Sequence, residues 1–362
     1  MVKILALLTD CFGGKGGIAA YNRALLTALV EDPCVSSVVA VPRQGGDFTE
    51  SLPPQLYLDR SGYGGRTAYL RTALCRAARD GPDLIFCGHV NLTPIAWLAA
   101  KLSGAPWILQ IHGIDAWQPS RRAMARSATQ RADHVMSVSQ LTLDRFLSFS
   151  PRLAAHATQI PLPLDLSAFG DGPKDTKLLA RYGLQGRKVV MTFGRLSALE
   201  QYKGFDEIID LMPELIRVRP DIAYLVAGDG DDRARLEAKA AKLGVSDRIA
   251  FTGFVPEAEK VATYRLADAY VMPSTGEGFG FVLLEAMACG IPAVASTLDG
   301  GREAVRDGLL GRLVDPRDRT ALMDAILAAL DQPRGVPPGL DYFAVEKFTE
   351  RVRAVAKSVV GR

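Results

Sequence analysis

The chain has 362 residues, 48% of them hydrophobic and 23% charged, a balance typical of a globular protein with room for two domains of ordinary size. No apolar run reaches the roughly 18–20 residues that cross a bilayer. The opening MVKILALLTD indicates a buried first strand and not a signal peptide. The five cysteines form no CxxC pair, which favours free thiols in the reducing cytosol.

The formal net charge is +3, but basic residues are concentrated in the first half. Residues 1–165 hold 16 Lys and Arg against 12 Asp and Glu, whereas the rest hold 27 against 28. A solvated helix face explains scattered arginines. The functional alternative is a surface that meets anionic lipid or a diphosphate-bearing acceptor. Basic and aromatic residues are not interleaved as in single-strand binders, so we expect no nucleic-acid partner.

Short apolar strands alternate with helical stretches along the whole chain. In the first half we expect strands at 2–8, 36–41, 84–88, 107–113 and 134–139, with helices such as 18–32 and 93–104. The proline- and glycine-rich segment 160–175 indicates a linker. Strands are expected again at 188–195, 222–230, 248–254, 269–274 and 292–296. This alternation predicts an α/β protein with two Rossmann-like, doubly wound domains whose strand carboxyl ends face a cleft.

The domain boundaries follow from the linker and the tail. We expect one Rossmann-like domain over 1–165 and a second over 166–340. The last segment, 341–362, has the pattern of a helix.

A glycine loop follows the first strand. Gly14, Gly16 and Ala19 match the dinucleotide fingerprint GxGxxA, but the second strand ends on Pro42 and Arg43 and not on the acid that would hold a ribose. An arginine suits a 2′-phosphate, so an NADP-dependent oxidoreductase stays open. The loop lacks the GK[ST] ending of a P-loop. We favour a loop that presents backbone amides, from Gly16 and neighbouring Gly17, to a diphosphate.

The segment EGFGFVLLEAMACG at 277–290 carries two acids, Glu277 in a glycine loop and Glu285 in an apolar helix. A carboxylate at a helix start is often only a cap, which is the alternative for Glu277. Glu285 has apolar neighbours, and a charge there usually has a partner or a ligand. Backbone amides of a loop and a helix start bind anions. The loop residues expected to hold the ligand are Gly278, Phe279, Gly280 and Phe281.

Two cations and one histidine complete the candidate site. Arg195 and Lys203 follow the first strand of the second half, where they could neutralise a diphosphate. Surface charges on a loop are the alternative. His112 ends a strand in the first half and is a candidate for catalysis or sugar positioning, although a structural histidine fits equally well. His89, at a similar strand end, and Asp115 are expected on the acceptor side.

These segments together resemble the retaining GT-B glycosyltransferases of family GT4. Glu277 to Glu285 resembles the E-x7-E motif of that family, and residues 194–204 resemble its GRL…KG motif. The resemblance implies that Glu277 holds the donor sugar, Glu285 the ribose, and Arg195 with Lys203 the diphosphate. It implies that 1–165 is the acceptor-binding domain and 166–340 the nucleotide-sugar-binding domain. It places His112 beside the transferred sugar, and it implies that the last helix, 341–362, crosses back to the first domain.

The reaction implied is transfer of a hexose from a GDP- or UDP-sugar to an acceptor hydroxyl with retention of configuration. The acceptor we expect is a glycan or lipid-linked glycan in exopolysaccharide or surface-glycan synthesis. No DxD motif ends a strand and no histidines pair at metal-ligand spacing, so we expect neither a metal nor another cofactor. We expect a cytoplasmic enzyme with peripheral contact to the inner face of the plasma membrane. A non-catalytic nucleotide-sugar-binding protein is the remaining alternative.

Overall fold

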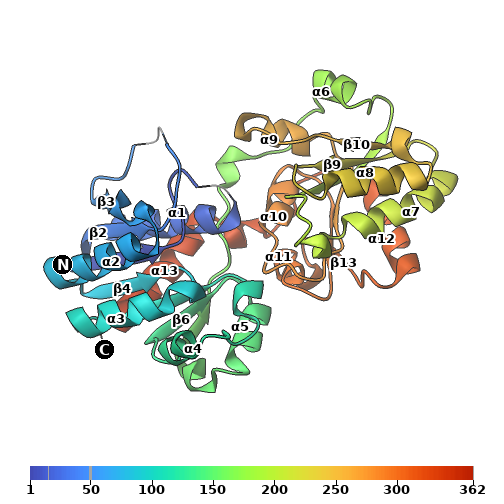
Figure 1. The fold of residues 1–362 in the computed structure, drawn as a ribbon. Coiled ribbons are helices and arrows are strands. Elements are labelled where there is room, and N and C mark those ends of the chain that lie inside the picture. The colour runs from blue at the N-terminus through green and yellow to red at the C-terminus, as the bar shows by residue number, and fades with distance from the viewer. Residues whose placement is uncertain (15, 49–50, 362) are drawn as a thin grey trace. The chain divides into compact units, whose positions relative to one another are not determined.

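The computed structural model describes residues 1–14, 16–48 and 51–361. They form two compact units, one of residues 1–163 with 343–362 and one of residues 164–342. Each unit contains one parallel sheet with helices packed against it (Figure 1). The strands are almost wholly apolar, as expected where both faces of a parallel sheet are covered. The predicted fold class is therefore confirmed.

The first unit has a seven-stranded sheet in the order β3-β2-β1-β4-β5-β6-β7. Its strands are β1 Val2–Leu8, β2 Val35–Pro42, β3 Leu56–Leu58, β4 Leu84–Cys87, β5 Trp107–Ile111, β6 His134–Ser137 and β7 Ala157–Gln159. Its helices are α1 Gly17–Val30, α2 Arg66–Asp80, α3 Thr93–Ser103, α4 Ala123–Thr129, α5 Gln140–Leu147 and α13 Val345–Val360. The strand order reverses between β1 and β4, which makes the carboxyl ends of these strands the expected ligand position.

The C-terminal helix α13 belongs to this first unit, as predicted (Figure 1, red among the blue and cyan elements). It lies against α1, where the Phe348 ring meets the Tyr21 ring edge to face at a centroid distance of 5.3 Å. Arg353 Nε also donates to the Ala28 carbonyl at 3.0 Å. Burial of such aromatic side chains stabilises the contact by about 1.5–3 kcal/mol each, which fixes the end of the chain to its beginning.

The second unit has a six-stranded sheet in the order β10-β9-β8-β11-β12-β13. Its strands are β8 Lys188–Phe193, β9 Ile222–Ala227, β10 Ile249–Phe251, β11 Ala269–Met272, β12 Ala293–Ser296 and β13 Arg312–Val314. Its helices are α6 Thr176–Arg181, α7 Phe205–Val218, α8 Arg233–Lys242, α9 Glu257–Tyr264, α10 Phe281–Ala288, α11 Gly301–Ala304 and α12 Arg319–Asp331. Here the order reverses between β8 and β11.

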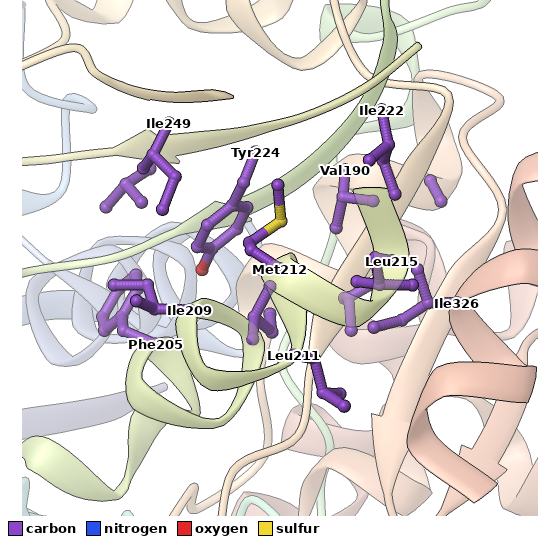
Figure 2. Close-up of a cluster of buried hydrophobic side chains, with 14 of the residues drawn as sticks. Val190, Phe205, Ile209, Leu211, Met212, Leu215, Ile222, Tyr224, Ile249 and Ile326 are labelled. Carbon is purple, nitrogen blue, oxygen red and sulfur yellow. The ribbon is translucent and has the colours of Figure 1, made fainter. Parts of the chain in front are cut away.

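The core of the second unit lies between this sheet and helices α7 and α12 (Figure 2). Helix α7 buries Phe205, Ile209 and Met212 at a spacing of three to four residues, which places them on one face of the helix. They pack with Tyr224 from β9 and Ile326 from α12. Because the strands are rigidly held by this packing, the loops at their carboxyl ends have fixed starting points.

No helix in the described parts of the chain is both long enough and apolar enough to span a bilayer.

Candidate active site

The basic pair of the second unit lies beyond β8, at the reversal of strand order. Arg195 forms an ion pair with Glu200, and its side chain is 70% exposed. Lys203 Nζ lies 3.7 Å from Glu200 Oε2 and 3.4 Å from Glu277 Oε2. Lys203 therefore links the loop after β8 to the loop after β11, and both predicted cations are held by acids of the same site.

The loop after β9 shows why glycine is needed where β8 and β9 end. Gly228 has φ +130°, and a side chain there would lie 2.0 Å from the Gly194 carbonyl oxygen. The Gly194 amide in turn donates to Ala227 O at 2.9 Å. This close backbone contact fixes the position from which Arg195 projects.

The backbone of Glu277 is fixed on both sides. Its amide donates to Asp299 Oδ2 at 2.8 Å, and its carbonyl accepts from the Gly300 amide at 2.9 Å. The Glu277 side chain is 21% exposed and points its carboxylate at Lys203. Asp299 was not predicted from the sequence, since it lies 22 positions away and carries no recognisable motif.

The loop 278–281 leads directly into α10. Gly280 precedes the helix with φ +92°, a conformation that favours glycine, and no side chain caps the helix start. Phe281 is part-exposed, whereas the Phe279 side chain is only 2% exposed. Phe279 thus belongs to the packed core, and only its backbone is available to a donor. The Gly278 carbonyl packs against Gly300, and a side chain at Gly300 would lie 2.1 Å from the Gly278 carbonyl oxygen.

Glu285 is buried, with 1% of its surface exposed. Its Oε1 is ion-paired with Lys260, and its Oε2 accepts a 2.6 Å hydrogen bond from the Tyr264 hydroxyl. Burial raises the pKa of this carboxyl, and Lys260 and Tyr264 counter the shift. A carboxylate has about four lone-pair positions, so a ribose would share Glu285 with these partners. The sequence offered one signal for them, their i, i+4 spacing on α9.

The first unit brings together His89, His112 and Asp115, all beyond the carboxyl ends of β4 and β5. The rings of His89 and His112 are 6.3 Å apart between centroids. His89 Nε2 lies 3.7 Å from Asp115 Oδ2, an oxygen that is buried and has no hydrogen-bond partner among the described residues. The Tyr21 ring packs edge-on against His112 at 5.3 Å. The two predicted acceptor-side residues therefore lie side by side.

Hydrogen bonds define the tautomers of both histidines. His112 Nε2 lies 3.0 Å from the Gly88 carbonyl, which only accepts, so Nε2 carries the proton and Nδ1 is an acceptor. His89 Nδ1 accepts from the Asn91 amide at 3.0 Å, so its proton is on Nε2, toward Asp115. Burial lowers the pKa of His112 to about 3 and that of His89 to about 4, and it raises the pKa of Asp115 to about 7. Both histidines are therefore neutral at physiological pH.

Gly16 and Gly17 lie at the start of α1. Gly16 has φ +90°, and no acidic residue or side-chain cap occupies the first turn of this 14-residue helix. A side chain built at Gly17 would meet nothing within 4 Å. Since neither packing nor a positive φ demands glycine at position 17, the open space above it fits close approach of a ligand.

Among residues 1–14, 16–48 and 51–361, no three His, Cys, Asp or Glu side chains are grouped so that they could hold a metal ion.

Two parallel α/β units with cations, acids and open helix starts beyond their strands have the architecture of the GT-B fold. The family model described as Glycosyl transferases group 1 matches residues 178–339, and that described as Glycosyltransferase Family 4 matches residues 15–168. The chain belongs to this family of glycosyltransferases and is an enzyme that transfers a sugar. Membership decides against the NADP-dependent oxidoreductase and the non-catalytic binding protein.

The relatives include mannosyltransferases. The GDP-mannose-dependent alpha-(1-6)-phosphatidylinositol monomannoside mannosyltransferase of Mycobacterium tuberculosis is 34% identical over 367 residues, covering 94% of this chain and 92% of the relative. The enzyme of that name from Mycolicibacterium smegmatis is 36% identical over 256 residues, 67% of this chain and 66% of its own. A phosphatidyl-myo-inositol mannosyltransferase of M. tuberculosis is 39% identical over 184 residues, about half of each chain (49% and 46%).

Solved structures share the fold. Anabaena HepE in complex with UDP and glucose superposes with a TM-score of 0.79 at 21% identity, covering 99% of this chain and all of the other. The lipopolysaccharide outer core galactosyltransferase WaaB gives 0.75 at 18% identity, covering 98% and 99%.

Proposed function

We propose that this enzyme is a retaining mannosyltransferase that moves mannose from GDP-mannose to a hydroxyl of a lipid-linked acceptor. The observation that carries the proposal is Lys203, held between Glu200 and Glu277 at the strand-order reversal of the second sheet. A cation in that position can neutralise a leaving diphosphate while Glu277 holds the sugar. The choice of GDP-mannose is supported by the relative that is 34% identical over nearly its whole length, a GDP-mannose-dependent mannosyltransferase.

Each residue then has a defined task. Arg195 and Lys203 neutralise the diphosphate, and the amides of Gly16, Gly17 and the start of α10 add backbone donors. The acceptor hydroxyl attacks the anomeric carbon from the face that the diphosphate leaves. The bond from that carbon to the phosphate oxygen breaks, and the departing oxygen takes the acceptor's proton. Because the protein's own cations and amides supply the positive charge, we propose that no metal ion is needed.

His112 acts in this scheme as a neutral hydrogen-bond acceptor. Its Nε2 is engaged with Gly88, which leaves Nδ1 free to accept from a hydroxyl of the transferred sugar. A histidine with a pKa near 3 does not gain a proton during the reaction at neutral pH. Its role is therefore positioning of the sugar and not acid catalysis.

Donor identity is tested by thermal shift and turnover. GDP and GDP-mannose should raise the melting temperature at concentrations where UDP, ADP and their glucose conjugates do so less, because binding to the native state stabilises it. Transfer from GDP-mannose should persist in EDTA, and the product should be the α-mannoside. Preferential stabilisation and turnover with a UDP-sugar would overturn the GDP-mannose assignment, and loss of activity in EDTA would overturn metal independence.

The ribose role of Glu285 needs its own test, because protein groups already engage this carboxylate. Glu285→Gln keeps the shape and an acceptor oxygen but loses the charge that pairs with Lys260. We expect a weaker affinity for GDP itself, by about tenfold, as lost hydrogen bonds to a charged acceptor cost about 1.5–3 kcal/mol. Tyr264→Phe removes one protein partner and leaves the carboxylate. Unchanged GDP affinity in a folded Glu285→Gln protein would refute the assignment.

The proposal of a lipid-linked acceptor is supported by a basic and apolar surface on helices α2, α3 and α4, which pack side by side. Residues 60–131 contain ten Lys and Arg against three Asp. The exposed basic side chains include Arg66, Arg71, Arg79, Lys101, Arg121 and Arg122. Leu98, Leu102 and Met124 are 39%, 54% and 62% exposed on the same helices. We call this surface the α2–α4 face.

An anionic bilayer is the partner that fits both properties of the α2–α4 face. Each basic residue near an anionic membrane contributes about 1 kcal/mol, and the exposed apolar side chains can enter the interface. We propose a cytoplasmic enzyme held peripherally at the inner face of the plasma membrane. The acceptor would be a lipid-linked glycan for cell-surface glycans, with a phosphatidylinositol mannoside as first candidate.

Vesicle binding and acceptor competition test this part. We expect sedimentation with phosphatidylglycerol vesicles at low salt, little with phosphatidylcholine, and release as salt rises. Arg121→Glu with Arg122→Glu should weaken binding, whereas Arg181→Glu, on α6 of the other unit, should not. Transfer to a phosphatidylinositol mannoside but not to a polyprenyl-diphosphate-linked glycan would identify the lipid. Robust transfer to a soluble sugar without vesicle binding would overturn the membrane role.

A further inference from the structure

The loop that carries Glu277 is held by a buried acid. Asp299 has no measurable exposure and follows β12, next to the two glycines that lead into α11. Its Oδ2 accepts from the Ser274 hydroxyl at 2.7 Å and from the Glu277 amide at 2.8 Å. Its Oδ1 accepts from the Gly301 amide at 3.0 Å. One carboxylate therefore joins the loop after β12 to both ends of segment 274–277.

The neighbouring backbone locks the same loop from the other side. The Gly300 amide donates to the Glu277 carbonyl at 2.9 Å, and a side chain at Gly300 would lie 2.1 Å from the Gly278 carbonyl oxygen. Gly276 packs against the Tyr202 ring, where a side chain would come within 2.7 Å. The loop is thus confined by contacts that leave little freedom for alternative conformations, and Asp299 is the carboxylate that holds its backbone.

We propose that the ionised carboxylate of Asp299 is the positioning group that holds Glu277 in its donor-binding geometry, so that sugar-nucleotide affinity falls when Asp299 is protonated or replaced. This inference rests on the proposed role of Glu277 in holding the donor sugar. Asp299 is a positioning residue because it contacts the donor only through Glu277.

The electrostatics give this role a pH dependence. Burial, with a smaller contribution from the negative charge of Glu277, raises the pKa of Asp299 to about 6, while Ser274 and the two amides oppose the shift. Tyr202 also interacts electrostatically with Asp299, and Lys203 lies 3.4 Å from the Glu277 carboxylate. Above about pH 6 the carboxylate accepts all three hydrogen bonds. Below about pH 6, the proton added to the Asp299 carboxyl competes with one of the three hydrogen-bond donors. The hydrogen bonding that fixes Glu277 then weakens.

The stability effect of Asp299 has the opposite sign to its functional effect. Because its folded-state pKa lies above the ordinary aspartate value of 3.8, folding costs free energy once the group is ionised, and this cost grows as pH rises from about 4 to 6. Replacement by a neutral side chain relieves that cost. A residue kept for stability alone would behave differently, which allows the two roles to be separated.

The test measures binding of GDP and GDP-mannose by calorimetry between pH 5 and 8, in the wild type and in Asp299→Asn. The asparagine amide would oppose one of the backbone N–H groups, so we expect about tenfold weaker GDP-mannose binding, in line with losses of orienting partners. GDP, which lacks the sugar, should lose less. The wild-type affinity for GDP-mannose should fall as pH drops below about 6, and the variant should lose this dependence without a lower melting temperature.

Ser274→Ala is the matched control. It removes one hydrogen bond that favours the ionised form but leaves Asp299 and the backbone contacts in place. The pH at which GDP-mannose affinity falls should therefore move upward, while affinity at pH 8 stays close to that of the wild type. A purely structural role would not produce this shift.

The outcomes separate the two levels of inference. If the wild type binds neither GDP-mannose nor any other sugar nucleotide, the proposed function fails. If it binds GDP-mannose and folded Asp299→Asn does so with the same affinity and pH profile, the positioning role fails and the proposed function survives. A Ser274→Ala profile that superposes on that of the wild type would also overturn the role of the ionised carboxylate.

Discussion

The two units differ in the charge of the functional groups that follow the carboxyl ends of their strands. In the second unit the functional groups are charged and paired: Arg195 with Glu200, Lys203 with Glu277, and Lys260 with Glu285. In the first unit the two histidines are neutral, because burial keeps the pKa values of His89 and His112 well below 6. Both groups lie beyond the carboxyl ends of parallel strands, so the same topology supports two kinds of recognition.

The difference corresponds to two parts of the proposed substrates. A nucleotide diphosphate is highly charged, and a set of cations already held by acids can exchange those acids for phosphate oxygens. A hexose is neutral, and directional acceptors such as His112 Nδ1 recognise its hydroxyls without the cost of burying a charge. Substitutions that remove a charge in the second unit should therefore weaken GDP binding, whereas those that remove a hydrogen-bond acceptor in the first unit should mainly lower turnover.

The largest effect is expected for Lys203→Ala. It removes the cation between Glu200 and Glu277, leaving two like charges together and no counter-charge for the diphosphate. We expect kcat/KM to fall about a thousandfold, the scale for loss of a transition-state charge stabiliser. Affinity for GDP should fall as well. Steady-state kinetics and calorimetry measure both.

Lys188→Ala is the control for Lys203. Lys188 is the first residue of β8, at the end of that strand opposite to the one that leads to Lys203, and it pairs with Asp268. Its removal should leave kcat/KM unchanged. Equal losses in the two variants would mean that general destabilisation, and not the site, explains the first result.

The neutral group of the first unit is tested by His112→Phe. The substitution keeps a planar ring against Tyr21 but removes the hydrogen bond to Gly88 and the acceptor at Nδ1. We expect about a hundredfold loss in kcat, the scale for a misplaced reacting group, with little change in GDP affinity. His156 directly precedes β7, at the amino end of that strand, and His156→Phe should leave kcat and GDP affinity unchanged. A fall in GDP affinity as large as that in Lys203→Ala would remove the distinction between the units.

Asp115 gives the first unit its expected pH dependence. Burial raises its pKa to about 7, so the carboxylate is formed as pH rises through 7, whereas His89 and His112 do not titrate between pH 5 and 8. Suppose that the buried Oδ2 accepts a hydrogen bond from the hydroxyl of the acceptor substrate. The KM for that substrate should then fall about tenfold as pH rises through 7, since ionisation of the carboxyl strengthens the hydrogen bond by about that much. Asp115→Asn should flatten the profile. A donor KM that changes instead would assign the titration to the second unit.

Sequence reasoning succeeded where function leaves local patterns. The fold class followed from alternating apolar strands and helices, and the E-x7-E and GRL…KG spacings led to Glu277, Glu285, Arg195 and Lys203. Their roles stay predictions. Strands β3, β7 and β13 have three residues each, too few to show a period, and were missed. The equally short β10 was found only because the longer stretch 248–254 has a strand pattern. Asp299, Lys260 and Tyr264 were missed because their importance arises only when distant segments fold together.

The burial of Phe279 and the pairing of Glu200 show the same limit. Phe279 lies in a glycine loop that suggested a ligand contact, yet its side chain is packed in the core. Glu200 carried no motif, but it engages Arg195 and Lys203 at once. Sequence spacing identifies which backbone segment reaches a site, whereas the direction of each side chain depends on what packs behind it.

The smallest effect, and the only gain, is expected for Glu200→Gln. Glu200 competes with the diphosphate for both cations, so its neutral isostere should bind GDP several-fold more tightly at low salt, the scale of a partly exposed ion pair of about 1 kcal/mol. The gain should shrink as salt rises. Turnover should not improve in proportion, because tighter binding of product GDP slows its release. Weaker GDP binding in this variant would show that Glu200 holds the cations in place for the donor and does not compete with it. The site of the second unit would then resemble that of the first unit. Both would bind their substrates through side chains held in a fixed orientation, and not through replacement of Glu200 by phosphate oxygens.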